Sequence, residues 1–403
     1  MGNLVRRPKR IWVLCLAMVM ILGTILTGCG KTAPAPQTSS PGVSESAKPT
    51  GSGDEIFDSF GITPLAKKTT LNLGYFSGAL YSAIIYGADQ KGWFEKAGLE
   101  LKYQSFDNGP AMMEANASWD VGASGAPGVL NGLFGYPIKC IGVVDYEQEQ
   151  CLYVRPDSKI AQSGKGNIKG YPDIYGKAED WKGTTWVMPV GTTVYMVFLD
   201  TLNKIGLTLD DVTVINMDVA SAKSAFLGGQ ADGAGVWMNT ALSVGAEGHV
   251  KAASAADGSV LASGMVATED ALKNKFEAVK IFYEVFVKAQ DYFAEHQDEY
   301  AAYLYETCIE EGVSATEDTT AALTKTYAFQ SSETIIKNML SEIDDVQGLA
   351  GRKVSQTEAD LLVMLDFFIG QGKYEQDKRT FLLNNGCFDS SVAKAAAADF
   401  GIK

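Results

Sequence analysis

Strand-like runs alternate with helix-like segments from about residue 69 to residue 237, and this alternation constrains the fold more than any other feature of the sequence. Apolar or alternating runs occur first at 71–75, 99–103, 120–123 and 138–144, and again at 185–188, 212–216 and 233–237. Segments with helical periodicity or glycine-containing turns separate them. Such an order is typical of mostly parallel sheets covered by helices on both faces. Because the series occurs twice, we predict two α/β lobes.

Beyond about residue 267 the sequence is nearly all helix-like. The predicted helices are 276–295, 297–312, 316–328, 333–343, 355–370 and 391–400. Their apolar stripes, such as Val279, Phe282 and Phe286, are most simply faces that pack on a core. We therefore expect residues 69–150 to form the first part of lobe 1 and residues 151–245 to form lobe 2. Residues 246–403 would complete lobe 1 with C-terminal helices.

The N-terminus has the pattern of an export signal. Residues 1–10 are basic, residues 11–26 are apolar and uncharged, and Leu26-Thr27-Gly28-Cys29 follows. The apolar run is shorter than the roughly 18–20 residues of a spanning helix. The tetrapeptide resembles a bacterial lipobox, which implies a signal peptide at 1–28 and a lipid on the Cys29 sulfur. An uncleaved anchor helix is the alternative. Residues 29–68 are expected to be a linker, since 30–53 is rich in Pro, Ser, Thr and Gly.

Charge and cysteine usage exclude several classes of function. The formal net charge is -14, and removal of the basic leader makes the chain more acidic still. Such a body is repelled by nucleic acid, so no nucleic-acid partner is expected. The six cysteines form no CxxC pair and the two histidines are far apart, so we expect neither a zinc site nor another cofactor. Cys140 and Cys151 flank a strand-like run, and either a disulfide or two buried thiols fits that spacing.

Three junction motifs resemble a known family. They are Gly92-Trp93-Phe94-Glu95-Lys96-Ala97-Gly98-Leu99-Glu100, the 202–207 run followed by Asp210-Asp211-Val212, and the 225–237 run that ends in Trp237. Together they are similar to the solute-binding proteins of ABC transporters for nitrate, sulfonates, taurine and thiamine-type pyrimidines. The resemblance covers roughly residues 69–370. It implies a type II periplasmic-binding-protein fold, a small solute held between two lobes, and a permease and an ATPase as partners. We expect a monomer on the outer face of the membrane.

Candidate binding residues follow the strand-like runs. In open parallel sheets, ligands bind beyond the carboxyl ends of the strands. In the first lobe those ends carry Tyr75, Ser77, Asn108, Gly109, Ser124, Gly125 and Asp145. In the second lobe they carry Gly191, Thr192, Thr193, Asp218 and Trp237.

The Gly191-Thr192-Thr193 turn is the strongest of these candidates. Its glycine lets the backbone approach a ligand, and the N–H groups of the following helix can hold an anion. The alternative is that a threonine simply caps the helix. Ser124-Gly125 offers the same arrangement in the first lobe, and Asn108-Gly109-Pro110 a similar one.

The remaining candidates bear on the class of solute. Trp237 and Tyr75 can form flat walls. Asp145 and Asp218 suit a ligand that also carries an amine, unless they are helix caps or surface charges. No Lys or Arg is clearly placed at a strand end.

These features favour taurine or an aliphatic sulfonate as the solute, then a thiamine-type pyrimidine or other heterocycle, then nitrate. An enzyme is not expected, because the sequence contains neither GxSxG nor HExxH. Ser391 and Lys394 match SxxK only formally, within an Ala-rich tail.

Overall fold

The computed structural model describes residues 53–75, 79–106, 108–146, 149–259, 261–310, 315–325, 327–344 and 352–403. The signal peptide, the lipobox with Cys29 and Ser77 lie outside these residues, so the predictions made for them stay predictions. Residues 51–403 form one compact unit. Among the helices in the described ranges, none combines the length and the apolar character needed to cross a membrane.

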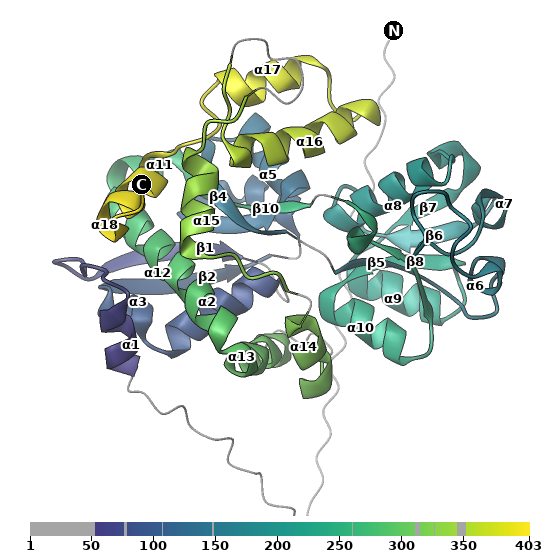
Figure 1. Ribbon diagram of the computed structural model, residues 1–403, viewed down its shortest axis with the longest axis horizontal. Coiled ribbons are helices and arrows are strands. Elements are labelled where there is room, and N and C mark those ends of the chain that lie inside the picture. Colours follow the sequence, from purple (N-terminus) through teal and green to yellow (C-terminus); the bar gives the residue numbers. More distant parts are fainter. Residues whose placement is uncertain are drawn as a thin grey trace, which may run out of the picture. The chain divides into compact units, whose positions relative to one another are not determined.

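The first sheet has five strands in the order β2-β1-β3-β10-β4. Figure 1 labels β1, β2, β4 and β10 of this sheet. Its strands are β1 (Thr69–Tyr75), β2 (Leu99–Ser105), β3 (Val121–Gly125), β4 (Ile138–Tyr146) and β10 (Ala262–Thr268). The helices between its first strands are α2 (Leu80–Gln90), α3 (Trp93–Lys96), α4 (Gly109–Glu114) and α5 (Ala126–Gly135). β1 runs parallel to β2 and β3, whereas β10 runs antiparallel to β3 and β4.

The second sheet also has five strands, in the order β7-β6-β8-β5-β9. Its strands are β5 (Gln150–Val154), β6 (Thr185–Met188), β7 (Thr213–Asn216), β8 (Gly233–Trp237) and β9 (Val250–Ser254). Its helices are α6 (Lys159–Ser163), α7 (Ala178–Trp181), α8 (Thr193–Lys204), α9 (Val219–Leu227) and α10 (Met238–Ala246). β6 is parallel to β7 and β8, and β5 is antiparallel to β8 and β9.

Both sheets are mostly parallel, as the alternation predicted, and each is mixed because one strand, β10 in the first sheet and β5 in the second, runs antiparallel to its neighbours. The chain enters the second sheet between β4 and β5 and returns to the first between β9 and β10. Because β9 pairs with β5, the second sheet continues past residue 245, where we had expected the second lobe to end. The prediction of two α/β lobes with a helical C-terminal region is confirmed.

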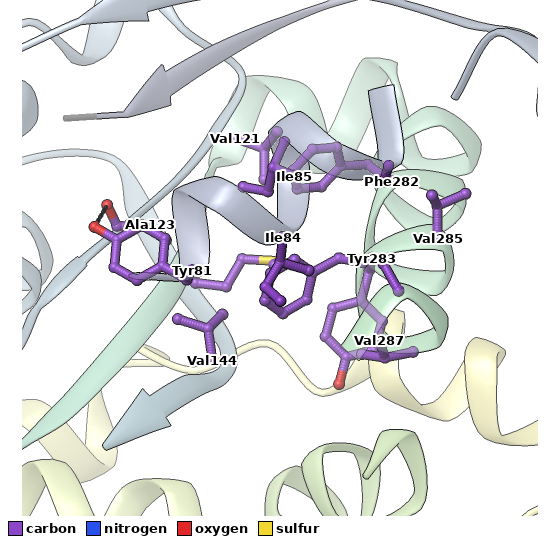
Figure 2. Close-up of a cluster of buried hydrophobic side chains, with 14 of the residues drawn as sticks. Tyr81, Ile84, Ile85, Val121, Ala123, Val144, Phe282, Tyr283, Val285 and Val287 are labelled. Carbon is purple, nitrogen blue, oxygen red and sulfur yellow. Dashed lines mark hydrogen bonds between the residues drawn. The ribbon is translucent and has the colours of Figure 1, made fainter. Parts of the chain in front are cut away.

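Helices make up the C-terminal region. They are α11 (Glu269–Asn274), α12 (Phe276–Glu295), α13 (Gln297–Glu310), α14 (Glu317–Thr324), α15 (Ser332–Leu340), α16 (Gln356–Gly370), α17 (Asp377–Asn384) and α18 (Ser391–Phe400). The long helix α12 forms the centre of the first lobe's core. Figure 2 shows Ile84 and Ile85 of α2 near Phe282 and Tyr283 of α12, with Val121 of β3 close by. Burial of such apolar surface is the main force that holds these layers together.

The core begins ahead of the first strand. Helix α1 (Gly53–Ser59) precedes Phe60, whose ring meets Trp93 edge-on with 4.8 Å between the ring centroids. Both aromatic side chains are buried, so the folded body starts before residue 69. Short 3-10 turns complete the described structure at Asn116–Ser118, Leu209–Asp211 and Ala255–Asp257.

The structure decides between a disulfide and two buried thiols for Cys140 and Cys151. Cys140 and Cys151 are buried in different core clusters and form no disulfide. The reading of two buried thiols therefore applies to this pair. Within the described ranges, no group of three or more His, Cys, Asp or Glu side chains is placed to hold a metal ion.

Candidate functional site

A pocket with about 610 Å³ of empty space lies where the first residues of several helices meet. Helices α2, α4 and α5 of the first lobe contribute to its lining, as do α8 and α10 of the second lobe. Each of these helices follows a strand directly or after a short turn. The pocket therefore lies beyond the carboxyl ends of the parallel strands, where this class of sheet binds ligands.

At several of these helix starts the N-cap residue makes no hydrogen bond from its own side chain to the helix. This holds for α2 after Ala79, α5 after Gly125, α8 after Thr192 and α10 after Trp237. The first N–H groups of a helix have no partner within the helix, so uncapped starts leave donors for a ligand. The partial positive charge of the same helix ends favours an anion. The backbone thus supplies the anion-binding character that the lining side chains do not.

The Thr192-Thr193 turn behaves as an open helix start rather than as a capped one. The hydroxyl of Thr192 donates a hydrogen bond of 2.7 Å to the carbonyl of Pro189 and does not cap α8. Thr193, the first residue of the helix, is almost fully buried and lines the pocket with Thr192. Gly191 has φ +83°, a backbone conformation that glycine adopts without strain. Gly191 is not one of the residues that line the pocket.

In the first lobe, two glycines enclose the Ser124 side chain. A Cβ added to Gly109 would lie 2.0 Å from the Ser124 Oγ, and one added to Gly128 would lie 2.3 Å from it. Ser124 itself is 1 % exposed, and its hydroxyl donates to the carbonyl of Gly125 at 3.2 Å. The glycine at 109 is therefore required for close approach of α4 to α5, in addition to its place in the pocket lining.

Asn108 has a capping role. Its side-chain oxygen accepts a hydrogen bond of 3.0 Å from the backbone N–H of Ala111, which satisfies one of the open donors of α4. Asn108 also lines the pocket.

Tyr81 fixes α2 against the sheet. It is buried, and its hydroxyl donates to the carbonyl of Ala123 at 2.9 Å (Figure 2). With Trp237, which ends β8, it gives the pocket aromatic surface from both lobes. Met238 follows Trp237 with φ +45°, which is unusual for a residue with a side chain. Such backbone conformations occur preferentially at functional sites, where the surrounding structure holds them.

The acidic and amide side chains of the lining come from the crossing between the lobes. Asp145, near the end of β4, is 2 % exposed, and Gln150, the first residue of β5, is 3 % exposed. Glu149 lies beside them, and its carbonyl accepts the N–H of Met238 at 3.0 Å. Among the described lining residues there is no Lys, Arg or His.

The structure brings together most of the predicted site residues. Those that line the pocket are Asn108, Gly109, Ser124, Gly125, Asp145, Thr192, Thr193 and Trp237. Tyr75 lies outside the lining and meets the ring of Tyr103 edge-on at 5.5 Å. Asp218 is also outside it: this exposed carboxylate caps α9 and accepts the backbone N–H of Ser221 at 2.8 Å. These bonds with Ser221 lower the pKa of Asp218.

Sequence reasoning did not select Glu149, Gln150 or Met238. Gln150 pairs with Trp237 because β5 runs antiparallel to β8. The start of an antiparallel strand lies at the same edge as the ends of its parallel neighbours, so these residues reach the pocket. Only the strand order could have indicated this.

The chain is similar to known proteins in sequence and in fold. Residues 79–300 match the family model described as NMT1/THI5 like. A Brachyspira hyodysenteriae protein named as an ABC transporter periplasmic binding protein is 24% identical over 295 residues, which is 72% of this chain and 80% of the relative. A Brucella abortus protein named as a binding protein is 30% identical over 235 residues, 57% of this chain and 68% of the relative.

Two solved structures illustrate the fold. The alkanesulfonate-binding protein SsuA from Xanthomonas axonopodis pv. citri, bound to MOPS, has a TM-score of 0.59 at 16% identity and covers 77% of this chain and 95% of its own. The nitrate-binding protein NrtA from Synechocystis has a TM-score of 0.63 at 14% identity, and the match covers 85% of this chain and 91% of the NrtA chain.

The fold has the predicted type II periplasmic-binding-protein architecture, with a pocket lined by both lobes. The chain belongs to the NMT1/THI5-like family.

Proposed function

We propose that this protein is the extracytoplasmic substrate-binding subunit of an ABC importer, and that it captures a small anionic or zwitterionic solute such as taurine or an aliphatic sulfonate. The observation that carries the proposal is the convergence of uncapped helix starts from both lobes on one pocket. The names of the relatives supply the transporter context.

A sulfonate suits this lining better than a multiply charged anion. Backbone N–H groups at helix ends can bind a singly charged group without a basic side chain. A multiply charged anion would need cationic side chains, and the described lining has none. Tyr81 and Trp237 then offer apolar surface to a short aliphatic chain.

A thiamine-type pyrimidine or another heterocycle is the second candidate. The specific observation in its favour is Trp237, whose ring could stack on a flat ligand. Nitrate is the third candidate, since it could use the helix starts but would leave the aromatic surface without a role.

Binding would act through closure of the two lobes. A solute that contacts α5 in one lobe and α8 in the other gains contacts only when both lobes surround it. The population would therefore shift toward the closed form. That form would dock on the permease and its ATPase, while the lipid on Cys29 would hold the protein at the outer membrane face as a monomer.

A thermal-shift screen of the full chain tests the proposal. The panel contains taurine, alkanesulfonates, nitrate, thiamine, pyrimidine precursors and riboflavin. A ligand at a hundred times its dissociation constant stabilises the folded state by about 2.7 kcal/mol. Stabilisation by a sulfonate, lost on Trp237→Ala and retained by the exposed-cap variant Asp218→Asn, is the expected result. Stabilisation only by heterocycles would contradict the sulfonate assignment.

Catalysis is the other class of function to test. Quantitative recovery of the unaltered solute after prolonged incubation, measured by mass spectrometry, is the result expected of a binding protein. Steady conversion of the solute would contradict it.

A further inference from the structure

We propose that Lys373 is a positioning residue of the solute site: its ammonium group reaches from the first lobe to the Gly191 turn of the second lobe and favours closure around an anion. The inference rests on the proposed function and deepens it, because it names a cation that acts on the pocket from outside its lining. It applies to a singly charged anion of either kind, a sulfonate or nitrate.

The contact between Lys373 and Gly191 connects the two lobes. A Cβ built on Gly191 would lie 3.6 Å from the Lys373 Nζ, which is an ordinary van der Waals distance. Gly191 directly precedes Thr192, which lines the pocket and is the N-cap residue of α8. The ammonium group therefore lies next to the turn from which a pocket-lining helix begins.

Aromatic rings hold Lys373 in the first lobe. The residue follows α16, and its Nζ lies 4.5 Å from the ring centroid of Phe368 and 5.6 Å from that of Tyr374. Such placement of a cation over aromatic rings is favourable. The Tyr374 ring in turn meets the ring of Phe134 in α5 edge-on, with 5.2 Å between the centroids. The backbone N–H of Lys373 donates to the carbonyl of Phe368 at 2.9 Å, so the main chain is fixed as well.

The Gly191 turn is fixed in the same way within the second lobe. The backbone N–H of Val190 donates to Oδ1 of Asn216, the last residue of β7, at 2.9 Å. The hydroxyl of Thr192 donates to the carbonyl of Pro189 at 2.7 Å. Two hydrogen-bonded turns, one from each lobe, thus meet at the Lys373 ammonium group. A movement of one lobe relative to the other must therefore change this contact.

The charge of Lys373 makes the contact sensitive to an anion. Among the described residues no carboxylate forms an ion pair with it. The residue as a whole is exposed, but partial burial of its ammonium group lowers its pKa. The start of α8 also carries a partial positive charge, which disfavours a cation beside it. An anion bound at that helix start would compensate both positive charges, so it would stabilise the contact and with it the closed form.

Gly191→Asp tests the contact without any solute. Aspartate adopts positive φ more readily than most residues, and its carboxylate would be within reach of the Lys373 amine. Treatment of the full chain with a carbodiimide should then join the two side chains through an amide bond, which mass spectrometry of the digested protein identifies. Gly191→Asn is the matched control and should give no such product. A folded Gly191→Asp variant without the cross-link would overturn the inference.

Lys373→Met tests the charge, since methionine can still pack on the two aromatic rings. Binding of ethanesulfonate and of nitrate to the full chain would be measured by isothermal titration calorimetry. Both affinities should fall roughly 5- to 10-fold, as expected for the loss of a nearby charge that does not touch the solute. Lys373→Arg keeps the positive charge and should restore both affinities to within about threefold of the wild type.

Lys378→Met is the matched control for the loss of a lysine. Lys378 belongs to α17 and lies over the rings of Phe134 and Phe381 at 5.1 and 5.0 Å. No atom of Lys378 lies within 4 Å of a Cβ built on Gly191. This variant should bind both anions as the wild type does.

The outcomes separate the inference from the proposed function. Equal anion affinity in the wild type and Lys373→Met, or an equal loss in Lys378→Met, would overturn the role of Lys373 and leave the anion-binding function standing. Failure of Lys373→Arg to restore binding would also overturn it, because the side chain would then act through packing and not through charge. If neither anion binds the wild type, the anion-binding function fails, and the inference fails with it.

Discussion

Replacing Gly128 with alanine should destabilise the packing beneath the pocket. The new Cβ would lie 2.3 Å from the Ser124 Oγ and 2.9 Å from the Cα of Gly109. The serine side chain could rotate, but the Gly109 backbone can move only if α4 shifts as a whole. Overpacking of this kind costs about 1–3 kcal/mol, and we expect the upper half of that range because a backbone atom is involved.

Gly135→Ala is the matched control. Gly135 ends the same helix α5, and a Cβ added to it would have no atom within 4 Å. Alanine there should leave stability unchanged or raise it by about 0.5 kcal/mol, since it restricts the unfolded chain without creating a clash.

A second pair of variants tests which atomic contacts cause the loss of stability. For Gly109→Ala the severe contact is with the Ser124 Oγ at 2.0 Å, while the Gly128 Cα is 3.2 Å away. Removing the hydroxyl with Ser124→Ala should therefore rescue most of the stability lost in Gly109→Ala. It should rescue less in Gly128→Ala, where the Gly109 backbone contact persists. The two double-mutant cycles should thus give different coupling energies.

Urea unfolding of the full chain without ligand measures these free energies. The reasoning would be refuted if Gly128→Ala and Gly135→Ala were equally stable, or if Ser124→Ala rescued both glycine variants to the same extent.

Two further predictions concern the first lobe. Tyr81→Phe removes the buried hydrogen bond to the Ala123 carbonyl and should cost about 1 kcal/mol in urea unfolding, and a cost near zero would show that the bond does not contribute. Glu284 lies near Lys280 and Asp399, and burial raises its pKa to about 7. Because the pKa is higher in the folded state, this group favours the folded state below its ordinary pKa, and that contribution is lost as the pH rises through about 7. Glu284→Gln should therefore be more stable than the wild type at pH 8 relative to pH 5, and an unchanged pH dependence of the unfolding free energy would contradict the assignment.

Local signals in the sequence predicted much of the fold. The observed bounds of α12 (Phe276–Glu295) and α18 (Ser391–Phe400) equal the predicted ones, because a helix with a regular apolar stripe is recognisable on its own. β10 (Ala262–Thr268) was not predicted. Its residues are mostly small, and all are buried, so the strand shows no alternation of polar and apolar positions.

The site residues also differ in whether a local sequence pattern identifies them. Ser124-Gly125 and Thr192-Thr193 were found because a strand followed at once by a helix start is a local pattern. Asp218 has an equally local pattern but only caps its helix. The place of Gln150 depends on which strands are neighbours in the second sheet, and that information is distributed over the whole chain.

Hydrogen–deuterium exchange of the full chain, with and without saturating solute, tests the central claim most directly. We predict that bound solute slows exchange at residues 124–128 of the first lobe and at residues 192–196 of the second lobe together, because both helix starts donate to one ligand. Protection confined to one lobe, or centred away from these helix starts, would contradict binding in the pocket between the two lobes.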